Sequence, residues 1–166
     1  MSKDVSLRVK AQRFGGKLSA MVLPNLGAFM GWGILTALGI WLSNDMLKAF
    51  ITPVLTYLLP LLIAISGGKM IYGEKGAVIG AFTTMGVIIG ADISMLLGAM
   101  IIAPLSAWLL KKLDAVVEPF IPVGFELLIG NLTVAVLGAA IAVIGCVWLA
   151  PAITSLSAVF SAGVST

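Results

Sequence analysis

Long apolar runs separated by short charged segments are the main pattern along this chain. Four stretches contain at most one charged residue: 18–44, 49–68, 76–110 and 127–166. A helix of about 20 apolar residues crosses the hydrocarbon core of a bilayer. The pattern therefore predicts an all-α, polytopic transmembrane protein, with clear spans at roughly 18–42, 49–68 and 127–150.

Prolines and short polar turns shape the first two spans. "SNDMLK" at 43–48 reads as a tight turn, and "GGKMIYGEKG" at 67–76 returns the chain to the side from which it started. Pro53 and Pro60 lie inside the second span. Membrane helices tolerate proline where neighbours satisfy the freed carbonyl, so we expect kinked spans rather than broken ones.

The stretch 76–110 needs a different explanation. As one helix it would be about 50 Å long, too long for one crossing, and lysines flank it at both ends. If both flanks are cytoplasmic, the chain makes either two thin passes or a re-entrant, broken-helix hairpin. "GADIS" supplies the turn: Gly90 suits a left-handed helix end, and Asp92 suits the N-cap of a second half beginning at Ile93. The glycine pairs 27/31, 76/80 and 86/90 predict close helix packing.

Composition supports this interpretation. The 166 residues are 60% hydrophobic and 10% charged, with a mean hydropathy of +1.15, whereas soluble domains are about a quarter charged. Residues 1–17 carry a basic stripe of Lys10, Arg13 and Lys17. This segment is either an amphipathic helix on the membrane surface or a plain basic flank, and both place the N-terminus in the cytoplasm. Residues 18–166 then form the membrane part.

The reactive side chains are few. The chain has no histidine, and its one cysteine, Cys146, lies in an apolar run. The commonest metal ligand and general base are therefore missing, and no disulfide framework exists. We expect no catalytic residue, no metal, no cofactor and no nucleic-acid partner.

Three stretches carry a family resemblance. They are "FGGKLSAMVLPNLGAFMGWGILTAL" (14–38), "TYLLPLLIAISGGKMIYGEKGAVIGAFTTMGVIIGADISMLLGAMIIAPL" (56–105) and "GFELLIGNLTVAVLG" (124–138). Together they resemble the N-terminal half of the membrane (enzyme II C) domain of mannitol permeases of the bacterial phosphoenolpyruvate-dependent sugar phosphotransferase system. The resemblance implies a homodimer in the bacterial inner membrane that binds mannitol or a related polyol. It also implies a remaining permease half, a cytoplasmic B domain with a phosphocysteine and an A domain with a phosphohistidine.

The sequence departs from that family's full pattern. The second half of the C domain and the B and A domains are missing, so the chain is expected to be truncated, and whether it has enzyme activity alone is left open. Cys146 lies in a predicted span and cannot be the B-domain phosphocysteine. "IIAPLSAW" (101–108) replaces a more glycine-rich segment, and Gly130 stands where the family has a second asparagine before Asn131.

Five residues are candidates for contact with the polyol, each with a structural alternative. Asp92 keeps a sugar cavity polar or only caps a helix, and Asn25 binds a hydroxyl or a carbonyl freed near Pro24. Trp32 stacks on the sugar or packs in the span. Glu126 and Asn131 lie on the substrate side or are solvated at the membrane interface.

The leading hypothesis is therefore a component of a mannitol transporter that forms part of the sugar pathway and of the dimer interface. A truncated scaffold that dimerises but transports nothing is a second hypothesis. A small oligomeric channel is a third, although the sequence lacks a ring-forming charge pattern or a filter-like repeat.

Overall fold

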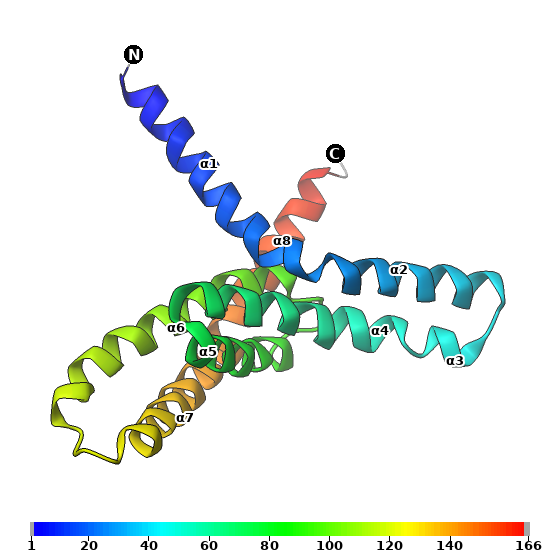
Figure 1. The fold of residues 1–166 in the computed structure, drawn as a ribbon. Helices are drawn as coiled ribbons and strands as arrows, with labels where there is room; N and C mark the ends of the chain where they lie inside the picture. The colour runs from blue at the N-terminus through cyan, green and yellow to red at the C-terminus, as the bar shows by residue number, and fades with distance from the viewer. Residues whose placement is uncertain (1, 165–166) are drawn as a thin grey trace.

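The structure, a computed structural model, describes the backbone of residues 2–164 and the side chains of residues 7–163. Every regular element in this part of the chain is helical, which confirms the all-α prediction. The elements are α1 (Ser2–Val22), η1 (Leu23–Asn25), α2 (Leu26–Trp41), α3 (Asp45–Lys48), α4 (Ile51–Pro53), η2 (Val54–Leu58), α5 (Leu59–Ile89), α6 (Leu96–Val117), η3 (Glu118–Phe120), α7 (Glu126–Ile144), η4 (Gly145–Leu149) and α8 (Ala150–Val164). In Figure 1, α5, α6 and α7 form the centre of the molecule, and α2 extends away beside α3 and α4.

The first predicted span consists of two helices joined at a proline. α1 runs without a break through the predicted boundary at residue 17 and ends at Val22. Pro24 has no N–H to donate, and a short 3-10 turn, η1, separates α1 from α2. The chain changes direction there (Figure 1). The predicted turn at 43–48 is confirmed: Asn44 Oδ1 accepts hydrogen bonds from the N–H groups of Met46 and Leu47 and begins the one-turn helix α3.

The second and third predicted segments are joined by a reversal inside α5. Tyr72 and Gly73 leave helical geometry, and Gly73 has φ 57° and ψ −144°, a conformation that only glycine adopts readily. The two arms, 59–71 and 74–89, pack antiparallel through glycine. A Cβ on Gly68 would collide with the Gly76 carbonyl, and a Cβ on Gly76 would collide with the Gly68 carbonyl. The expected return of the chain at 67–76 is confirmed.

Two prolines follow π-helical segments: η2 precedes Pro60, and η4 precedes Pro151. In π geometry each carbonyl accepts from the N–H five residues later. Each proline therefore leaves one carbonyl, that of Leu55 or Cys146, without its backbone donor. The Ser94 hydroxyl donates to the Leu55 carbonyl at 3.1 Å. The kink expected at Pro60 is therefore a π-helical segment. The Leu55 carbonyl that Pro60 leaves without a backbone donor accepts its hydrogen bond from Ser94, far away in the sequence.

The hairpin predicted within 76–110 is present, but its turn differs from the prediction. The first helix ends at Ile89 as expected, whereas the second begins at Leu96, after a non-helical linker at 90–95. The left-handed position of Gly90 was predicted wrongly, because its φ is −80°. The N-cap role of Asp92 was also predicted wrongly: α6 begins after Met95 without a side-chain cap.

Tertiary contacts explain this longer turn. A Cβ on Gly90 would collide with the Cys146 carbonyl, so glycine permits close packing here rather than a left-handed turn. Ser94 ties the other end of the linker to η2. Between the two helices, the Thr83 and Ser106 hydroxyls lie 3.0 Å apart. Thr83 also bonds the Ile79 carbonyl, as expected of a helical threonine, whereas the buried Thr84 hydroxyl lacks a partner among the described residues.

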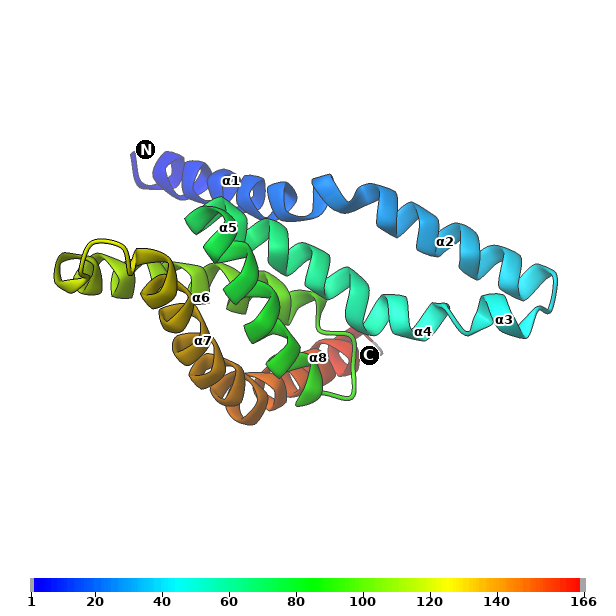
Figure 2. The same cartoon turned by 60° about the horizontal axis from the view of Figure 1, so that its bottom comes forward.

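The last predicted span continues further than expected. α7 begins at Glu126, and the helix passes through η4 into α8 as far as Val164, with a bend that is visible in Figure 2. The glycine pairs 76/80 and 86/90 pack closely against neighbouring backbone, as predicted. The pair Gly27 and Gly31 does not: a Cβ on either would meet no described atom within 4 Å.

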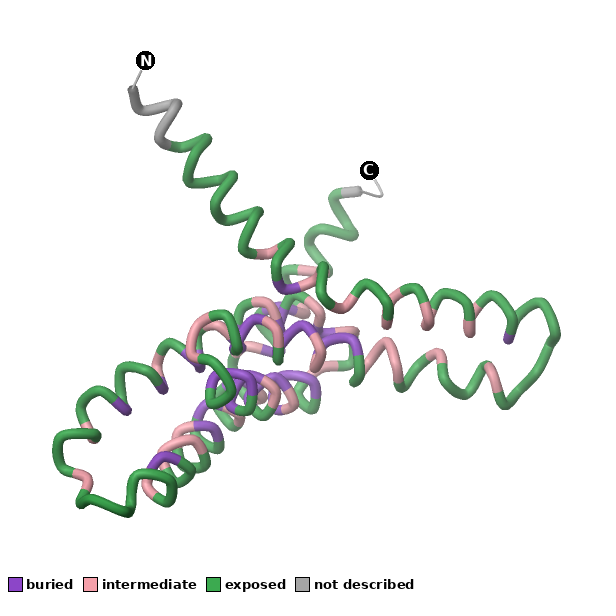
Figure 3. Tube along the Cα trace, viewed as in Figure 1, coloured by how far each residue is buried: buried purple, intermediate pink, exposed green. Residues whose placement is uncertain are grey.

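Four helical stretches are long and apolar enough to cross a membrane: Leu7–Trp41, Asp45–Ile89, Leu96–Phe120 and Glu126–Gly163. The second of them contains the reversal at Gly73. Large apolar side chains lie on the outside, including Trp41 (81% exposed) and Trp148 (74%). Figure 3 shows buried residues gathered at the centre, with α1, α2 and α8 largely exposed. Surfaces this apolar suit lipid rather than water, and the chain is a multi-pass membrane protein.

Candidate functional site

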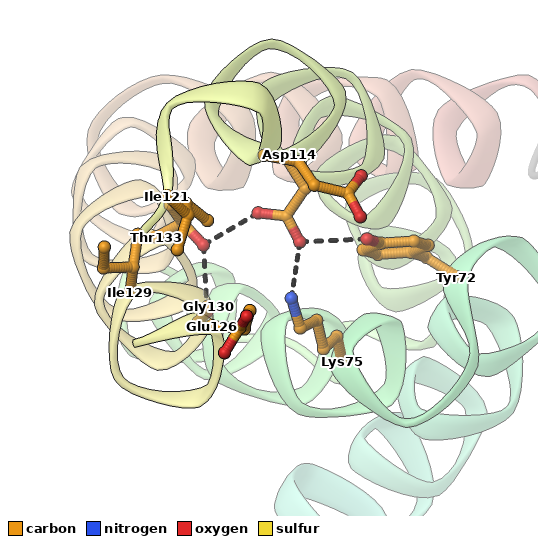
Figure 4. A pocket seen from close by; sticks show the side chains of 9 residues that line it. Tyr72, Lys75, Asp114, Ile121, Glu126, Ile129, Gly130 and Thr133 are labelled. Carbon is orange, nitrogen blue, oxygen red and sulfur yellow. Dashed lines mark hydrogen bonds and ion pairs between the residues drawn. The ribbon is translucent and has the colours of Figure 1, made fainter. Parts of the chain in front are cut away.

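A polar cluster centred on Asp114 joins the three helices α5, α6 and α7 (Figure 4). Asp114 lies on α6 and is only 8% exposed. Its Oδ2 accepts hydrogen bonds from Lys75 Nζ at 2.7 Å and from the Tyr72 hydroxyl at 2.9 Å, and its Oδ1 accepts one from Thr133 Oγ1 at 2.8 Å. The carboxylate thus receives a cation and two neutral donors, which satisfies the requirement that a buried charge be paired and hydrogen-bonded.

The fold brings these groups together from distant parts of the sequence. Tyr72 lies in the reversal inside α5 and Lys75 follows it by two residues, so both project from the same sharp bend. Thr133 lies on α7, two turns after the helix begins. A Cβ on Gly130 would lie 2.8 Å from Lys75 Nζ. Gly130 therefore leaves the room through which the lysine passes across α7 to reach Asp114.

The cluster lines a small polar cavity of about 100 Å³. Glu118 and Glu126 contribute two further carboxylates to its lining, beside the apolar side chains of Ile121 and Ile129. Asp114 is already bonded to three donors, so its evident role is to hold three helices together. Glu118 and Glu126 offer acceptors to hydroxyl groups or water. Among the described side chains, no set of three or more His, Cys, Asp or Glu residues is grouped to hold a metal ion.

Two of the predicted site residues, Glu126 and Asn131, lie near this cluster. Glu126 opens α7 and accepts a hydrogen bond from the Gly124 N–H at 2.9 Å. Its side chain also lines the cavity. Asn131 is exposed on the next turn of α7. Of the five predicted residues, Glu126 alone lines the Asp114 cavity.

Asn25 and Trp32 lie elsewhere and have structural partners. Asn25 Nδ2 approaches the Met21 and Leu62 carbonyl oxygens at 3.0 and 3.1 Å and Ser66 Oγ at 2.8 Å. It therefore ties the break after α1 to the first arm of α5. Trp32 Nε1 donates to the Ile51 carbonyl at 3.0 Å, which joins α2 to α4. The amide N–H groups of Asn25 and the indole N–H of Trp32 are thus engaged within the protein.

Asp92 lies in the 90–95 linker and is exposed. The linker precedes α6, whereas Glu126 follows the other end of that helix. The 22 residues of α6 span about 33 Å at 1.5 Å per residue, a distance far longer than a six-carbon polyol. Asp92 and Glu126 therefore do not contact one sugar molecule at the same time in this structure.

Sequence reasoning missed Asp114, Lys75, Tyr72 and Thr133 as a group. One signal was available: Lys75 and Asp114 are charges just outside the two ends of the predicted hairpin, where antiparallel helices bring flanking residues together. A turn centred on Asp92 would have placed Lys75 opposite residues that precede Lys111. In the structure Lys75 instead pairs with Asp114, and that pairing depends on tertiary contacts.

Comparison with known proteins finds similar chains among mannitol-specific components of the PTS system. It is 46% identical over 167 residues to the "PTS system mannitol-specific EIICB component" of Halalkalibacterium halodurans, covering 99% of this chain and 36% of the relative. The matching component of Bacillus subtilis is 47% identical, covering 95% of this chain and 34% of the relative. The "PTS system mannitol-specific EIICBA component" of Escherichia coli is 47% identical, covering 99% and 26% respectively.

The chain thus spans about a quarter to a third of the length of these relatives. No family model matches it, and no solved structure matches it. An identity of 46–47% over nearly the whole chain leaves no doubt about common ancestry. The resemblance noted in the sequence is confirmed: this chain is homologous to an N-terminal part of mannitol-specific components of the phosphotransferase system.

Proposed function

We propose that this chain forms part of the mannitol-translocation pathway of a phosphotransferase permease in a bacterial inner membrane. The observation that carries the proposal is the identity of 46–47% to mannitol-specific components over 95–99% of the chain. The helical hairpin of α5 and α6, interrupted by the 90–95 linker, supports it. Interrupted helices that end inside a membrane protein are common where transporters bind their substrates.

The proposed orientation places the N-terminus in the cytoplasm. Lys75 follows the reversal in α5, and Lys111 and Lys112 precede the end of α6, so the hairpin carries basic residues at one end. That end also holds the Asp114 cluster. The positive-inside rule assigns such an end to the cytoplasm. The 90–95 linker then lies deep in the membrane or at its far side.

Within the pathway, we assign polyol contacts to the residues predicted from the sequence, at different points along it. Asp92 is exposed and has no hydrogen-bond partner among the described residues, so its carboxylate is free to accept from a sugar hydroxyl. Glu126, on the proposed cytoplasmic side, is placed to meet the sugar as it leaves, with Asn131 one turn beyond. Asn25 and Trp32 border the pathway, held by their bonds to α5 and α4.

The proposed partners follow the same argument. Gly27 and Gly31 form an open small-residue face on α2, flanked by the exposed Met30 and Ile34. Such faces let membrane helices approach closely, so α2 is the proposed contact with a second copy in a homodimer. Phosphate would come from B and A domains such as those indicated by the names EIICB and EIICBA of the relatives.

A chimera tests the proposal. The aligned part of this chain replaces the corresponding part of the Bacillus subtilis component, and mannitol uptake is measured in cells that lack their own mannitol permease. We expect uptake close to that of the unmodified component. In the same chimera, Asp92→Asn and Asp92→Ala remove the charge, and both should weaken mannitol affinity by about tenfold or more, because a charged acceptor contributes about 1.5–3 kcal/mol.

The controls separate transport from a purely structural role. Asp45→Asn changes an exposed acid in the α3 turn and should leave uptake and affinity unchanged. A chimera that inserts and dimerises but takes up no mannitol would favour the scaffold hypothesis. Unchanged affinity in both Asp92 variants would remove Asp92 from the pathway.

A further inference from the structure

A second cavity, unrelated to the Asp114 cluster, is an apolar groove between α1, α5 and α6. Its volume is about 470 Å³, and side chains that line it include Phe14, Leu18, Met21, Met70, Met100 and Trp108. At one end of the groove Met21, on α1, is 2% exposed, and a Cβ on Gly67 would contact both Met21 and Pro104. The three helices therefore close the groove at that end, beside Gly67 and Pro104.

The other end of the groove is cationic. Lys17 lines it one turn before Met21 on α1. Trp108 also lines it, and Lys112 Nζ lies 5.8 Å from the centre of the Trp108 ring. Neither lysine forms an ion pair with an acidic side chain in the described part of the chain; the ion pairs there involve Lys48, Lys69 and Lys75. Lys17 and Lys112, neither of them in an ion pair, and the Trp108 indole thus border one end of the apolar groove.

We propose that this groove binds an anionic phospholipid of the bilayer. One acyl chain lies along the apolar walls, and the headgroup phosphate lies between Lys17 and Lys112. The charge pattern favours this ligand over a helix of a second copy, because an apolar helix would leave both ammonium groups without a counter-charge. Tryptophan at the mouth is typical of the membrane–water interface, where headgroups lie. The proposal does not depend on mannitol transport.

Tryptophan fluorescence can report occupancy of the groove. In the 166-residue chain, Trp32, Trp41 and Trp148 are replaced by phenylalanine, which leaves Trp108 as the only emitter. The protein is placed in vesicles that contain phosphatidylglycerol or phosphatidylcholine with brominated acyl chains, which quench a tryptophan in contact with them. We expect half-maximal quenching of Trp108 at a several-fold lower fraction of phosphatidylglycerol than of phosphatidylcholine.

The chain supplies a matched control emitter. A variant that keeps only Trp148, which is 74% exposed on η4, reports lipid contact in a region without charged residues, since 127–166 contains none. Trp148 should be quenched equally by the two lipids. In the Trp108 reporter, Lys17→Ala and Lys112→Ala should each reduce the preference for phosphatidylglycerol, by up to about fivefold. Lys48→Ala, in the distant α3 turn, should not change it.

A thermal-shift measurement on the chain with all four tryptophans covers the case in which the single-tryptophan variants fold poorly. Added phosphatidylglycerol in detergent should raise the melting temperature more than phosphatidylcholine does, and the Lys17→Ala/Lys112→Ala double variant should abolish the difference. Equal quenching of Trp108 by both lipids would overturn the proposal. So would a preference that survives in the double variant, or a Trp108 shielded from both lipids by a second copy of the chain.

Discussion

The ion pair between Lys75 and Asp114 makes a quantitative prediction about the stability of the helix ends. Lys75→Met removes the cation but leaves a carboxylate whose side chain is 10% exposed, with Tyr72 and Thr133 as its remaining donors. Breaking a buried ion pair costs about 3–5 kcal/mol. The lysine side chain is 45% exposed, which weakens the pair, so we expect a loss of about 2–4 kcal/mol in the free energy of unfolding.

The double variant Lys75→Met/Asp114→Leu provides the sharper test. It removes both charges, so no buried carboxylate remains unpaired. Thr133 keeps the Gly130 carbonyl as an acceptor at 2.9 Å, and the half-buried Tyr72 hydroxyl can reach water. Replacement of a buried pair by apolar residues is often close to neutral. We therefore expect the double variant to lose only about 1 kcal/mol, less than Lys75→Met alone.

The assay is equilibrium unfolding in mixed micelles, with increasing dodecyl sulfate in dodecyl maltoside and helix content followed by circular dichroism. Lys48→Met is the matched control, because Lys48 pairs with Asp45 at 3.9 Å and that aspartate side chain is 99% exposed. Exposed helical pairs contribute about 0.5 kcal/mol or less. The reasoning is refuted if Lys75→Met loses no more than Lys48→Met, or if the double variant is less stable than Lys75→Met.

Two further predictions concern the path of the chain. Gly73→Ala forces a Cβ into a backbone conformation with φ 57° and should lower the free energy of unfolding by about 1–3 kcal/mol. The control Gly16→Ala lies in α1, where a Cβ meets no described atom within 4 Å, and should raise the free energy of unfolding by about 0.5–1 kcal/mol. A Gly73→Ala variant as stable as the unmodified chain would contradict the reversal. The second prediction is tested in a Cys146→Ala background with an impermeant maleimide. Glu74→Cys and Lys112→Cys should be labelled from the cytoplasmic side, and Asp45→Cys from the periplasmic side. Periplasmic labelling of Lys112→Cys would exclude the hairpin orientation.

The sequence by itself determined the fold class, the approximate positions of the spans and the places where the chain reverses. Runs of apolar residues report directly on the thickness of a bilayer, and charged residues inside it are costly and therefore rare. These are local properties, so they could be read without a structure. The reversal at 67–76 and the hairpin within 76–110 followed from length and from the flanking lysines. The homology to mannitol-specific components was equally legible, because it rests on residue identity.

Only the tertiary structure decided how the hairpin turns and what its charged ends do. Local preference favoured a tight turn with Asp92 as a helix cap, but the contacts of Gly90 with the Cys146 backbone and of Ser94 with Leu55 hold a longer linker. In this arrangement of α5 and α6, Lys75 pairs with Asp114. The register between two helices depends on contacts among residues far apart in the sequence. The energies of these contacts are similar to the energy of a local helix cap, so local preference alone does not decide the register. For that reason the pattern along the chain located the hairpin but could not identify Asp114 as the buried carboxylate that joins its two ends.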